Sequence, residues 1–579
     1  MSNEIRSGIF EHMKEVLKNY EALRGIPVNK DEKVFWDAVI ISACDSEQEN
    51  GYNLQIIEKR ERGEVPLMVP FHVFFDPPGY KIGCGGSTMY ILSKISKIYG
   101  KEMSSMRFLV IPAGGYSQRL PNLTVLGKLF SPLPFGNQRY QMLDLILATY
   151  LPFLKRMPPG VFLASSDAII SYNIHDDDEW TFENGGFTAL AHPSPILIGT
   201  SHGVYAIPEN QDFSKGSTIM SNCLRVLQKP TIEEMREKGA VVKNISIPGL
   251  DNEEIIFSDS AFFFDHSVSK ILLDIYKKHK PIKCELSSYG DFLQPLGLAA
   301  SPSYIMDKGP SGELTSLQTV LYMNLFGTNL SIFVLKHSNF HHLGTMKEYL
   351  QTLCDETRFS EAFSLSKFSL CAPSIENIKP IYIHGTIINS MIHPLSVIPK
   401  STLLEYCDIQ ISIEAGQNSI ISNIHLPGYS IQKLPLPIPD NTLIHTIPLK
   451  KGFVTVAFHI HEDIKKTYQK TNCCKMRYFG KELRRFVKYD NALFSSDCDS
   501  VSLWETKLFP VCETPGSSFK YTLELVLSII LTDQMCSDFS MTRQGVEWVS
   551  MKDILACKDT EKMIVYQENL CEKTSSILK

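Results

Sequence analysis

The stretch Phe108 to Phe135 reads FLVIPAGGYSQRLPNLTVLGKLFSPLPF and decides the fold. Its apolar start, FLVIP, predicts a short buried strand that runs directly into a pair of glycines, Gly114 and Gly115. Glycine has no Cβ, so backbone N–H groups at such a pair can approach a phosphate closely. Arg119 and Lys128 follow as two cations, which indicates binding of a polyphosphate rather than a surface turn with two solvated side chains. The Walker A pattern is excluded, because leucine follows the lysine and the spacing differs.

Similar apolar runs lie on both sides of this stretch. They are FWDAVIISA at Phe35–Ala43, FHVFF at Phe71–Phe75 and VFLA at Val161–Ala164, with amphipathic segments at Met89–Tyr99 and Gln141–Phe153. Continuous apolar strands separated by helices predict an α/β fold with a mostly parallel sheet that is covered on both faces. Ligands of such folds bind at the carboxyl ends of the strands, which is where the glycine pairs fall.

The second half of the chain shows a different period. From Met391, apolar residues recur every six positions, at Met391, Val397, Leu403, Ile409, Ala415 and Ile421. A six-residue repeat is typical of a β-helix, whose coils bury their apolar faces only by stacking. An ordinary β-sandwich is the alternative. Beyond about Ile464 the pattern becomes mixed and ends in a predicted helix at Met551–Leu570.

Composition limits the kinds of partner. The 579 residues carry 57 basic and 63 acidic side chains, a net charge of −6, so we expect no general attraction to nucleic acid or to an anionic membrane. The apolar run Leu523–Leu531 is far shorter than a membrane-spanning helix. The first 20 residues lack the apolar core of a signal peptide, and the 14 cysteines show no disulfide framework. We therefore expect a cytoplasmic protein with free thiols.

Three stretches resemble, in chain order, the motifs of the sugar-1-phosphate nucleotidyltransferases. GGYSQRLP, with Lys128 after it, resembles the family signature GGxGTRLxP followed by a lysine. VLQKP at Val226–Pro230 resembles the strand that ends in EKP, and FHHLGTMKEYL at Phe340–Leu350 resembles WxDIGTPEDYL. The departures from the family pattern are Ser117-Gln118 for Gly-Thr, Gln228 for Glu and His342 for Asp.

Within this family the chain is most similar to the branch that transfers GMP from GTP to L-fucose-1-phosphate. The similar stretches are KIGCGGSTMYIL at Lys81–Leu92, GFTALAHP at Gly186–Pro193, YGDFLQPLG at Tyr289–Gly297 and SLWETKLFPV at Ser502–Val511. The resemblance implies GTP and L-fucose-1-phosphate as substrates, with direct in-line attack of the sugar phosphate on the α-phosphorus. Two other functions stay open, a non-catalytic nucleotide- or sugar-phosphate-binding regulator of the same fold and, more weakly, a hexapeptide-repeat acyltransferase. The sequence does not indicate an oligomeric state.

The domain organisation follows from the pattern and the resemblance together. We expect an N-terminal helix in residues 1–33 and a Rossmann-like (GT-A-type) catalytic domain in 34–350. A linker at 351–378, a degenerate left-handed β-helix-like domain at 379–463 and a mixed, partly helical C-terminal region at 464–579 should follow.

The resemblance also implies roles for the charged residues. Arg119 should hold the β- and γ-phosphates, Lys128 should lie against the α-phosphate, and Lys229 should bind the sugar phosphate. Asp167 should ligate Mg²⁺, with Asp259 as the second ligand and Asp291 as the alternative, although aspartates at strand ends more often serve as turn residues.

The remaining expected contacts concern the nucleotide and the sugar. Nucleotide binding is expected at Gly114, Gly115 and Ser117, and at a second glycine loop that opens a helix, at Gly83, Gly85, Gly86 and Ser87. A purely structural turn is the alternative for this second loop. His202 and Gly203, in GTSHGVY, resemble the segment that lines the sugar pocket, and His202 could equally orient a loop.

Overall fold

A computed structural model of the chain underlies the following description. It describes residues 3–29, 32–175, 177–182, 185–209, 211, 213, 216–243, 247, 250, 253–306, 312–355, 357–375, 382–428, 434–470, 475–486, 493–495, 499–531 and 546–578.

The chain folds into two compact units. The first comprises Met1–Gly115 and Leu143–His341, and the second comprises Tyr116–Met142 and His342–Lys579. Gly114 and Gly115 therefore lie in the first unit, whereas the residues that follow them, up to Met142, belong with the C-terminal half of the chain.

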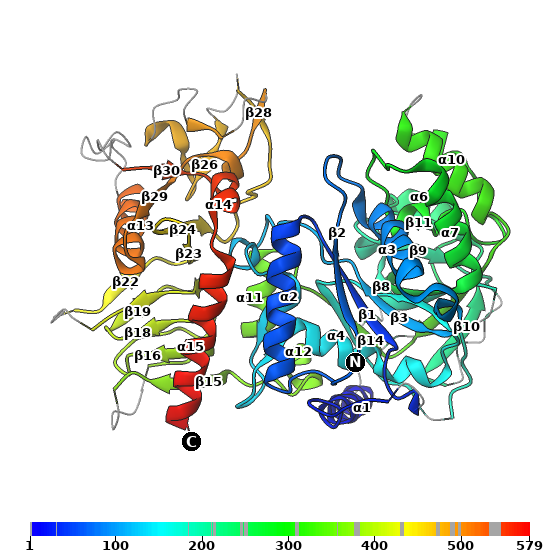
Figure 1. Cartoon of the computed structure of the whole chain (residues 1–579), viewed down its shortest axis with the longest axis horizontal. Coiled ribbons are helices and arrows are strands. Elements are labelled where there is room, and N and C mark those ends of the chain that lie inside the picture. The colour runs from blue at the N-terminus through cyan, green and yellow to red at the C-terminus, as the bar shows by residue number, and fades with distance from the viewer. Residues whose placement is uncertain are drawn as a thin grey trace. The chain divides into compact units, whose positions relative to one another are not determined.

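A large mixed sheet forms the centre of the first unit (Figure 1). Its strands, in spatial order, are β10 (Thr218–Asn222), β13 (Asn329–Leu335), β8 (Gly186–Pro195), β12 (Ile255–Asp265), β6 (Gly160–Leu163), β3 (Arg107–Ile111), β1 (Ala38–Ala43) and β2 (Phe71–Phe75). The four strands predicted from their apolar runs, β6, β3, β1 and β2, are parallel to one another, as expected. The sheet as a whole is mixed rather than mostly parallel, because β12 runs antiparallel to both β6 and β8.

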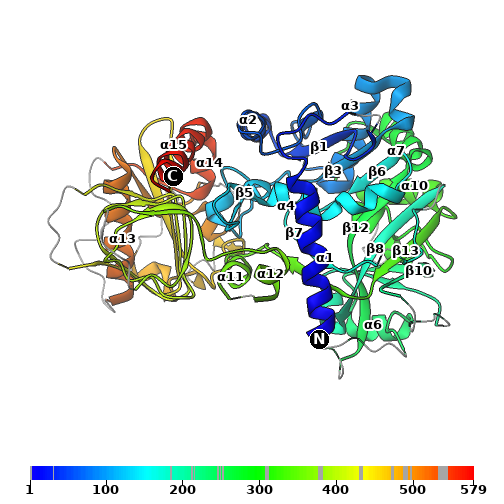
Figure 2. The same ribbon diagram turned by 90° about the horizontal axis from the view of Figure 1, so that it is seen from below.

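Helices cover both faces of this sheet. On one face, α3 (Gly83–Tyr99), α7 (His266–His279) and α10 (Glu313–Leu325) pack side by side and share a core with Ile40, Phe108 and Val110 (Figure 1). The long α2 (Ser46–Glu61) packs on β1 and β2 and begins at Asp45, whose carboxylate accepts a hydrogen bond from the Gln48 N–H. The N-terminal helix α1 (Asn3–Glu21) lies against β7 (Ala168–Tyr172) (Figure 2).

Smaller elements complete the first unit. They are α4 (Met142–Tyr150), α5 (Ile196–Gly199), α6 (Ile232–Glu237), α8 (Ser288–Asp291), α9 (Ser303–Met306), β9 (Gly203–Ala206), β11 (Arg225–Gln228) and β14 (Ser338–His342). β9 pairs with β11 and β12, and β14 pairs with β7.

The second unit is built on short parallel strands. These are β15 (Phe368–Pro373), β16 (Thr386–Ile392), β17 (Leu403–Glu405), β18 (Asp408–Ile409), β19 (Ile413–Ala415), β20 (Ile420–Ser422), β21 (His425–Leu426), β22 (Leu436–Ile438) and β23 (Thr442–Pro448). Thr386 pairs with Leu403, which pairs in turn with Ile420, so these strands return to the same column of a parallel sheet. Cross-coil hydrogen bonds join residues 17 apart, one fewer than three six-residue repeats would give. Met391 consequently pairs with Asp408, the residue before the repeat position.

Antiparallel strands and helices follow these parallel strands in the second unit. β24 (Phe453–His459) forms a hairpin with β23, and β29 (Phe509–Cys512) and β30 (Trp548–Val549) extend the sheet. Smaller strands lie at β4 (Pro132–Leu133), β5 (Tyr140–Gln141), β25 (Tyr468–Gln469), β26 (Arg477–Tyr478), β27 (Lys481–Glu482) and β28 (Ser500–Val501). The helices are α11 (Met346–Leu350), α12 (Thr357–Ala362), α13 (Pro515–Leu531), α14 (Met551–Cys557) and α15 (Thr560–Leu578).

The final helix predicted at Met551–Leu570 is two helices, α14 and α15. The chain is extended at Lys558, and Asp559 then starts α15 by accepting a hydrogen bond from the Lys562 N–H. An aspartate that caps a new helix is a strong start signal, and the sequence prediction passed over it.

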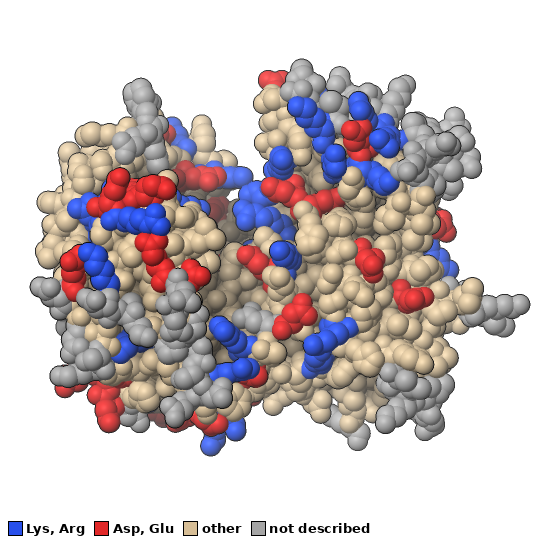
Figure 3. Space-filling view, turned by 180° about the vertical axis from the view of Figure 1, so that it is seen from behind, with Lys and Arg blue, Asp and Glu red and all other residues tan. Residues whose placement is uncertain are grey.

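Surface charge matches the small net charge of the chain. Basic and acidic side chains both appear across the face drawn in Figure 3, without one sign dominating it. Within the described residues, no helix is long and apolar enough to cross a membrane.

Candidate active site

Strand β1 fixes the first glycine loop, Ala113–Gly115, through the side chain of Ser42. The hydroxyl oxygen of Ser42 accepts hydrogen bonds from the N–H groups of Ala113 and Gly114, at 3.0 and 3.2 Å. A Cβ at Gly114 would lie 3.1 Å from the carbonyl carbon of Ala43, so this glycine is explained by close packing on β1. Gly115 differs, because its φ of 135° favours glycine and a Cβ there would meet open space.

Helix α2 fixes the carbonyl groups of the same loop. The Gln48 amide donates to the Gly115 carbonyl at 2.9 Å, and the Tyr52 hydroxyl donates to the Ala113 carbonyl at 2.9 Å. Sequence reasoning missed Ser42, Gln48 and Tyr52. The available signal was one serine inside an otherwise apolar strand and the polar inner face of the helix that follows it.

The second glycine loop is packed tightly by a neighbouring segment. The Gly85 N–H donates to the Leu286 carbonyl at 2.8 Å, and a Cβ at Gly83 would lie 2.3 Å from that same oxygen. Gly86 lacks space for a Cβ because it faces Ile82 at 2.8 Å. These three glycines therefore have structural reasons that need no ligand, as the structural alternative expected.

Ser87, in the first turn of α3, and Asp76, just after β2, mark a different feature of this region. Ser87 Oγ and Asp76 Oδ1 are both buried. Burial raises the pKa of Asp76 to about 6, although its contact with the Ser87 hydroxyl lowers it. Asp76 was not predicted from the sequence.

Strands β9 and β11 bring His202, Gly203, Gln228 and Lys229 together. Gln228 pairs with Gly203, and the Lys229 N–H donates to the His202 carbonyl at 3.0 Å. Lys229 is exposed and has a φ of 50°, in the left-handed region that a residue before proline rarely adopts. Backbone strain of this kind is concentrated at functional positions, and Ser117 shows it as well, with a φ of 47°.

Asp259 reaches the same group from β12. The register of β12 against β8 shifts between Asp259 and Phe262, and bulges of this kind redirect side chains next to active sites. A Cβ at Gly203 would lie 2.3 Å from Asp259 Oδ2 and 3.1 Å from Gln228 Oε1, so only glycine permits this approach. Burial raises the pKa of Asp259 to about 7, although the N–H of Gly203 and the charge of Lys229 lower it.

The structure separates the two alternatives for a second metal ligand. The carboxylate of Asp291 accepts hydrogen bonds from the Ser287 N–H and the Gln318 amide, both at 2.7 Å, and so holds α8 in place. Asp167 is half-buried after β6 and accepts a hydrogen bond from the Ser165 hydroxyl at 2.7 Å. The charges of Asp259 and Asp167 both act on the buried hydroxyl of Tyr289, which has no partner among the described residues.

Ser117, Arg119 and Lys128 belong to the second unit, whereas the other predicted site residues belong to the first. Arg119 is exposed, and its carbonyl accepts a hydrogen bond from the Met346 N–H at 3.2 Å. Lys128 is half-buried and begins the short 3₁₀ helix Lys128–Phe130.

His342, which departs from the family pattern, lies 3.3 Å from a carboxylate oxygen of Glu348. Burial alone would raise the pKa of Glu348, but the contact with His342 and hydrogen bonds from Thr345 and Gly344 lower it to about 2. His342 thus holds the start of α11.

The first unit alone has the parts of a phosphate-binding α/β protein. A fixed glycine loop follows a central parallel strand, and a strained, exposed lysine lies close enough to a buried carboxylate for its charge to act on it. The class defined by this fold and site is that of α/β proteins that bind phosphates at strand ends.

Comparison with known proteins narrows this class. Residues 100–514 match the model of the fucose pyrophosphorylase domain, so the chain belongs to the fucose pyrophosphorylase family. It is 34% identical to the fucose-1-phosphate guanylyltransferase of Homo sapiens and 33% identical to that of Mus musculus. Each alignment covers 97% of this chain, and 94% and 96% of the two relatives, respectively. A bifunctional fucokinase/GDP-fucose pyrophosphorylase of Arabidopsis thaliana is 23% identical over 82% of this chain and 47% of its own length.

Proposed function

We propose that this chain is a nucleotidyltransferase that transfers GMP from GTP to L-fucose-1-phosphate, forming GDP-L-fucose and pyrophosphate. The similarity to fucose-1-phosphate guanylyltransferases over 97% of the chain carries the proposal. The strained, exposed Lys229 with its neighbouring carboxylate supports a ligand site at this position, because such strain is concentrated at active sites and ligand clamps.

The reaction requires positioning and charge stabilisation more than covalent chemistry. Lys229 holds the phosphate of the sugar, so that its oxygen faces the α-phosphorus in line with the departing pyrophosphate. Lys128 stabilises the charge that develops on the α-phosphate, and Arg119 holds the β- and γ-phosphates as they leave. His202 keeps Lys229 in its strained conformation by accepting its N–H.

Mg²⁺ fits the carboxylates of the first unit. Magnesium takes one or two carboxylates together with waters and phosphate oxygens, so a cluster of three acids is not required. Asp167 and Asp259 would hold the ion, which would neutralise charge on the phosphates. Asp291 stays the alternative ligand, because its two hydrogen bonds give it a structural role in holding α8.

The finer architecture and location are also proposals. The parallel pairing of β2, β1, β3 and β6 supports a GT-A-type arrangement for residues 34–350. The parallel pairing of β16, β17, β20 and β23 supports a short left-handed β-helix for 379–463. A cytoplasmic location agrees with free thiols at the described cysteines.

The test is a matrix of four nucleoside triphosphates against several sugar-1-phosphates, with pyrophosphate release as the readout. We expect turnover with GTP, L-fucose-1-phosphate and Mg²⁺ together. Lys128→Met and Lys229→Met should each lower kcat by about 10²–10³, the typical loss when one group that stabilises transition-state charge is removed. Lys277→Met, at an exposed lysine of α7 that pairs with Asp274, is the matched control and should leave kcat unchanged. Tight GTP binding without any turnover would instead favour the regulatory alternative.

A further inference from the structure

Glu405, at the end of β17, is a carboxylate buried without a cation. Its side chain is 1% exposed, and the contacts recorded for it in the described part of the chain come from neutral groups. The Asn122 amide donates to Oε1 at 2.8 Å, the Ser422 hydroxyl donates to Oε1 at 2.7 Å, and the Tyr349 hydroxyl donates to Oε2 at 2.8 Å. Burial raises the pKa of Glu405, although these three hydrogen bonds lower it. A buried acidic group is tolerated only where donors of this kind satisfy it.

Two of these donors lie on the segments that flank Arg119. Asn122 is in the 3₁₀ turn Pro121–Leu123, three residues after Arg119, and this turn packs on β23. Tyr349 is in α11, whose first residue, Met346, donates its N–H to the Arg119 carbonyl. Glu405 therefore joins the chain that follows Arg119 to the helix that holds the Arg119 backbone.

The third donor extends the network into the parallel strands. Ser422 donates to Glu405 and accepts from His445 Nδ1 at 3.0 Å, and His445 is fully buried. Burial lowers the pKa of His445 to about 3, so its ring is neutral. His445 lies on β23, on which the Asn122 turn packs, and Ser422 shares Oε1 with Asn122, whereas Tyr349 contacts Oε2.

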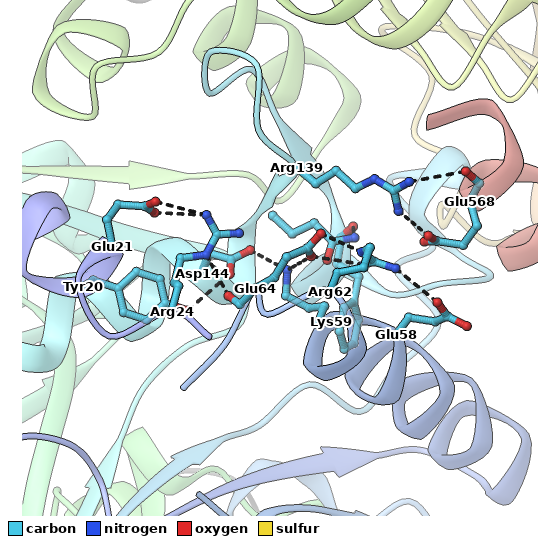
Figure 4. A network of polar contacts seen from close by, with 12 residues as sticks. Tyr20, Glu21, Arg24, Glu58, Lys59, Arg62, Glu64, Arg139, Asp144 and Glu568 are labelled. Carbon is cyan, nitrogen blue, oxygen red and sulfur yellow. Dashed lines mark hydrogen bonds and ion pairs between the residues drawn. The ribbon is translucent and has the colours of Figure 1, made fainter. Parts of the chain in front are cut away.

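Other contacts hold residues 116–142 further along. The Ser366 N–H donates to the Pro134 carbonyl at 2.7 Å, and Arg139 pairs with Glu568 of α15 (Figure 4). These anchors lie well beyond Arg119 in the chain. The hydrogen bonds through Asn122 and Tyr349 lie nearer to Arg119, on the turn that follows it and on the helix whose first residue binds its carbonyl.

We propose that Glu405 is a positioning residue for Arg119, so that the C-terminal unit sets the geometry of the polyphosphate-binding arginine through a buried carboxylate. The proposal rests on the proposed function, because it assigns Arg119 to the triphosphate. A small displacement of a substrate-holding group can cost about 10² in rate, so loss of the anchor should be visible in kinetics.

The kinetic test compares variants of Glu405 and of the residues that donate hydrogen bonds to it. Asn122→Ala and Glu405→Gln should raise KM for GTP and lower kcat/KM for GTP by about 10- to 100-fold, while KM for L-fucose-1-phosphate changes less than about twofold. Ser422→Ala removes a donor that lies on β20, outside the Asn122 turn and α11, and should move KM for GTP much less. Partial unfolding would lower only the apparent kcat, because it reduces the amount of active enzyme without changing either KM.

Glu462→Gln is the matched control for replacing an acidic side chain of the second unit by its amide. Glu462 is also in the second unit, and its carboxylate accepts from the backbone N–H groups of His459 and Phe479, away from the Arg119 segment. It should change thermal stability and leave both KM values in place. If Asn122→Ala and Glu405→Gln leave KM for GTP unchanged, as Glu462→Gln does, the positioning role is overturned.

A polarity swap gives a rescue test. In the double variant Asn122→Asp/Glu405→Gln, the new amide donates to the new carboxylate, so the link is restored with its direction reversed. We expect the double variant to recover at least half of the loss in log kcat/KM, and a strictly additive loss would contradict the proposal.

Amide hydrogen exchange on the peptide that covers residues 116–127 provides a readout independent of turnover. The N–H groups of Leu123 and Gly127 donate within this turn, so Glu405→Gln should lower their protection while Glu462→Gln does not. If the wild-type chain fails to make GDP-fucose but exchange responds as expected, the proposed reaction falls and the anchor stands. Unchanged exchange in an active enzyme overturns the anchor alone.

Discussion

Each unit contains a fully buried carboxylate, and the two are stabilised in opposite ways. In the first unit, Asp144 of α4 lies 2.7 Å from the Lys59 ammonium, and Lys59 also lies 3.1 Å from Glu64 (Figure 4). Asp144 and Lys59 are 0% and 1% exposed, respectively. In the second unit, Glu405 is held by three neutral donors.

The difference teaches what each arrangement can do. An ion pair is strong but weakly directional, and it joins α2, α4 and, through the Tyr20 hydroxyl, α1. Neutral donors around a carboxylate each demand a particular direction, so they fix the segments that carry them. The ion pair is suited to holding helices together, and the neutral donors are suited to fixing the position of a loop.

The largest expected effect is on the free energy of unfolding when the Lys59–Asp144 ion pair is broken. Lys59→Met removes the cation that lies 2.7 Å from the fully buried Asp144, whereas Glu64 keeps Arg62 at 2.6 Å. Breaking a buried pair from one side costs about 3–5 kcal/mol of unfolding free energy. Urea denaturation followed by circular dichroism measures this loss.

The double variant Lys59→Met/Asp144→Leu is the control for this loss. It removes both charges and fills the space with apolar groups, so it should lie within about 2 kcal/mol of the wild type. If the double variant is as unstable as Lys59→Met, hydrogen bonds rather than charge pairing stabilise Asp144. The proposed difference between Asp144 and Glu405 would then be wrong.

A half-buried acid of the second unit, Glu462, extends the comparison through pH. Burial raises the pKa of Glu462 from 4.5 to about 8, although two backbone N–H groups lower it. The folded chain therefore retains this proton to higher pH than the unfolded chain does. The stability it contributes is fully present below about pH 4.5 and is lost as pH rises toward 8, at up to about 1.4 kcal/mol per pH unit. Glu462→Gln should flatten the difference in stability between pH 5 and pH 8, and an unchanged slope would reject the assignment.

Glu64 behaves oppositely and sharpens the same contrast. Burial alone would raise its pKa, but Lys59 and Arg62 lower it to about 2. Its contribution to stability is therefore present above its ordinary pKa of 4.5 and is lost as pH falls toward 2. Glu64→Gln should weaken the loss of stability between pH 5 and pH 3, which thermal denaturation at several pH values measures.

Features that leave a local sequence pattern could be predicted, whereas features set by distant contacts could not. The run FLVIP became β3 with its parallel neighbours, because a buried parallel strand leaves a continuous apolar run. The antiparallel β12 was not foreseen, since a fully buried strand reads the same in either direction. The six-residue period located the parallel strands but missed their pairing intervals, which are 17 residues from β16 to β17 and from β17 to β20, and 23 residues from β20 to β23.

The candidate site divides along the same line. Lys229 and Asp259 could be named from short motifs, and the structure brings them close enough for their charges to interact. Gln48 and Glu405 could not be named, because their effect on the glycine loop and on the Arg119 segment arises only after folding. Asn122 and Glu405 are 283 positions apart in the chain, a separation at which no local pattern carries information.

The smallest expected effect compares two tyrosines that serve the two carboxylates. The Tyr20 hydroxyl donates to Asp144 at 3.2 Å, and the Tyr349 hydroxyl donates to Glu405 at 2.8 Å. Tyr20→Phe leaves Lys59 in place, so it should cost about 0.5–1 kcal/mol of unfolding free energy. Tyr349→Phe removes the hydroxyl that donates to Oε2 of Glu405, a buried acid without a cation, so it should cost about 1.5–3 kcal/mol. Equal losses in paired urea denaturations would mean that the two carboxylates are held alike. A larger loss at Tyr349, accompanied by a raised KM for GTP, would show that the neutral donors hold both the charge and the loop.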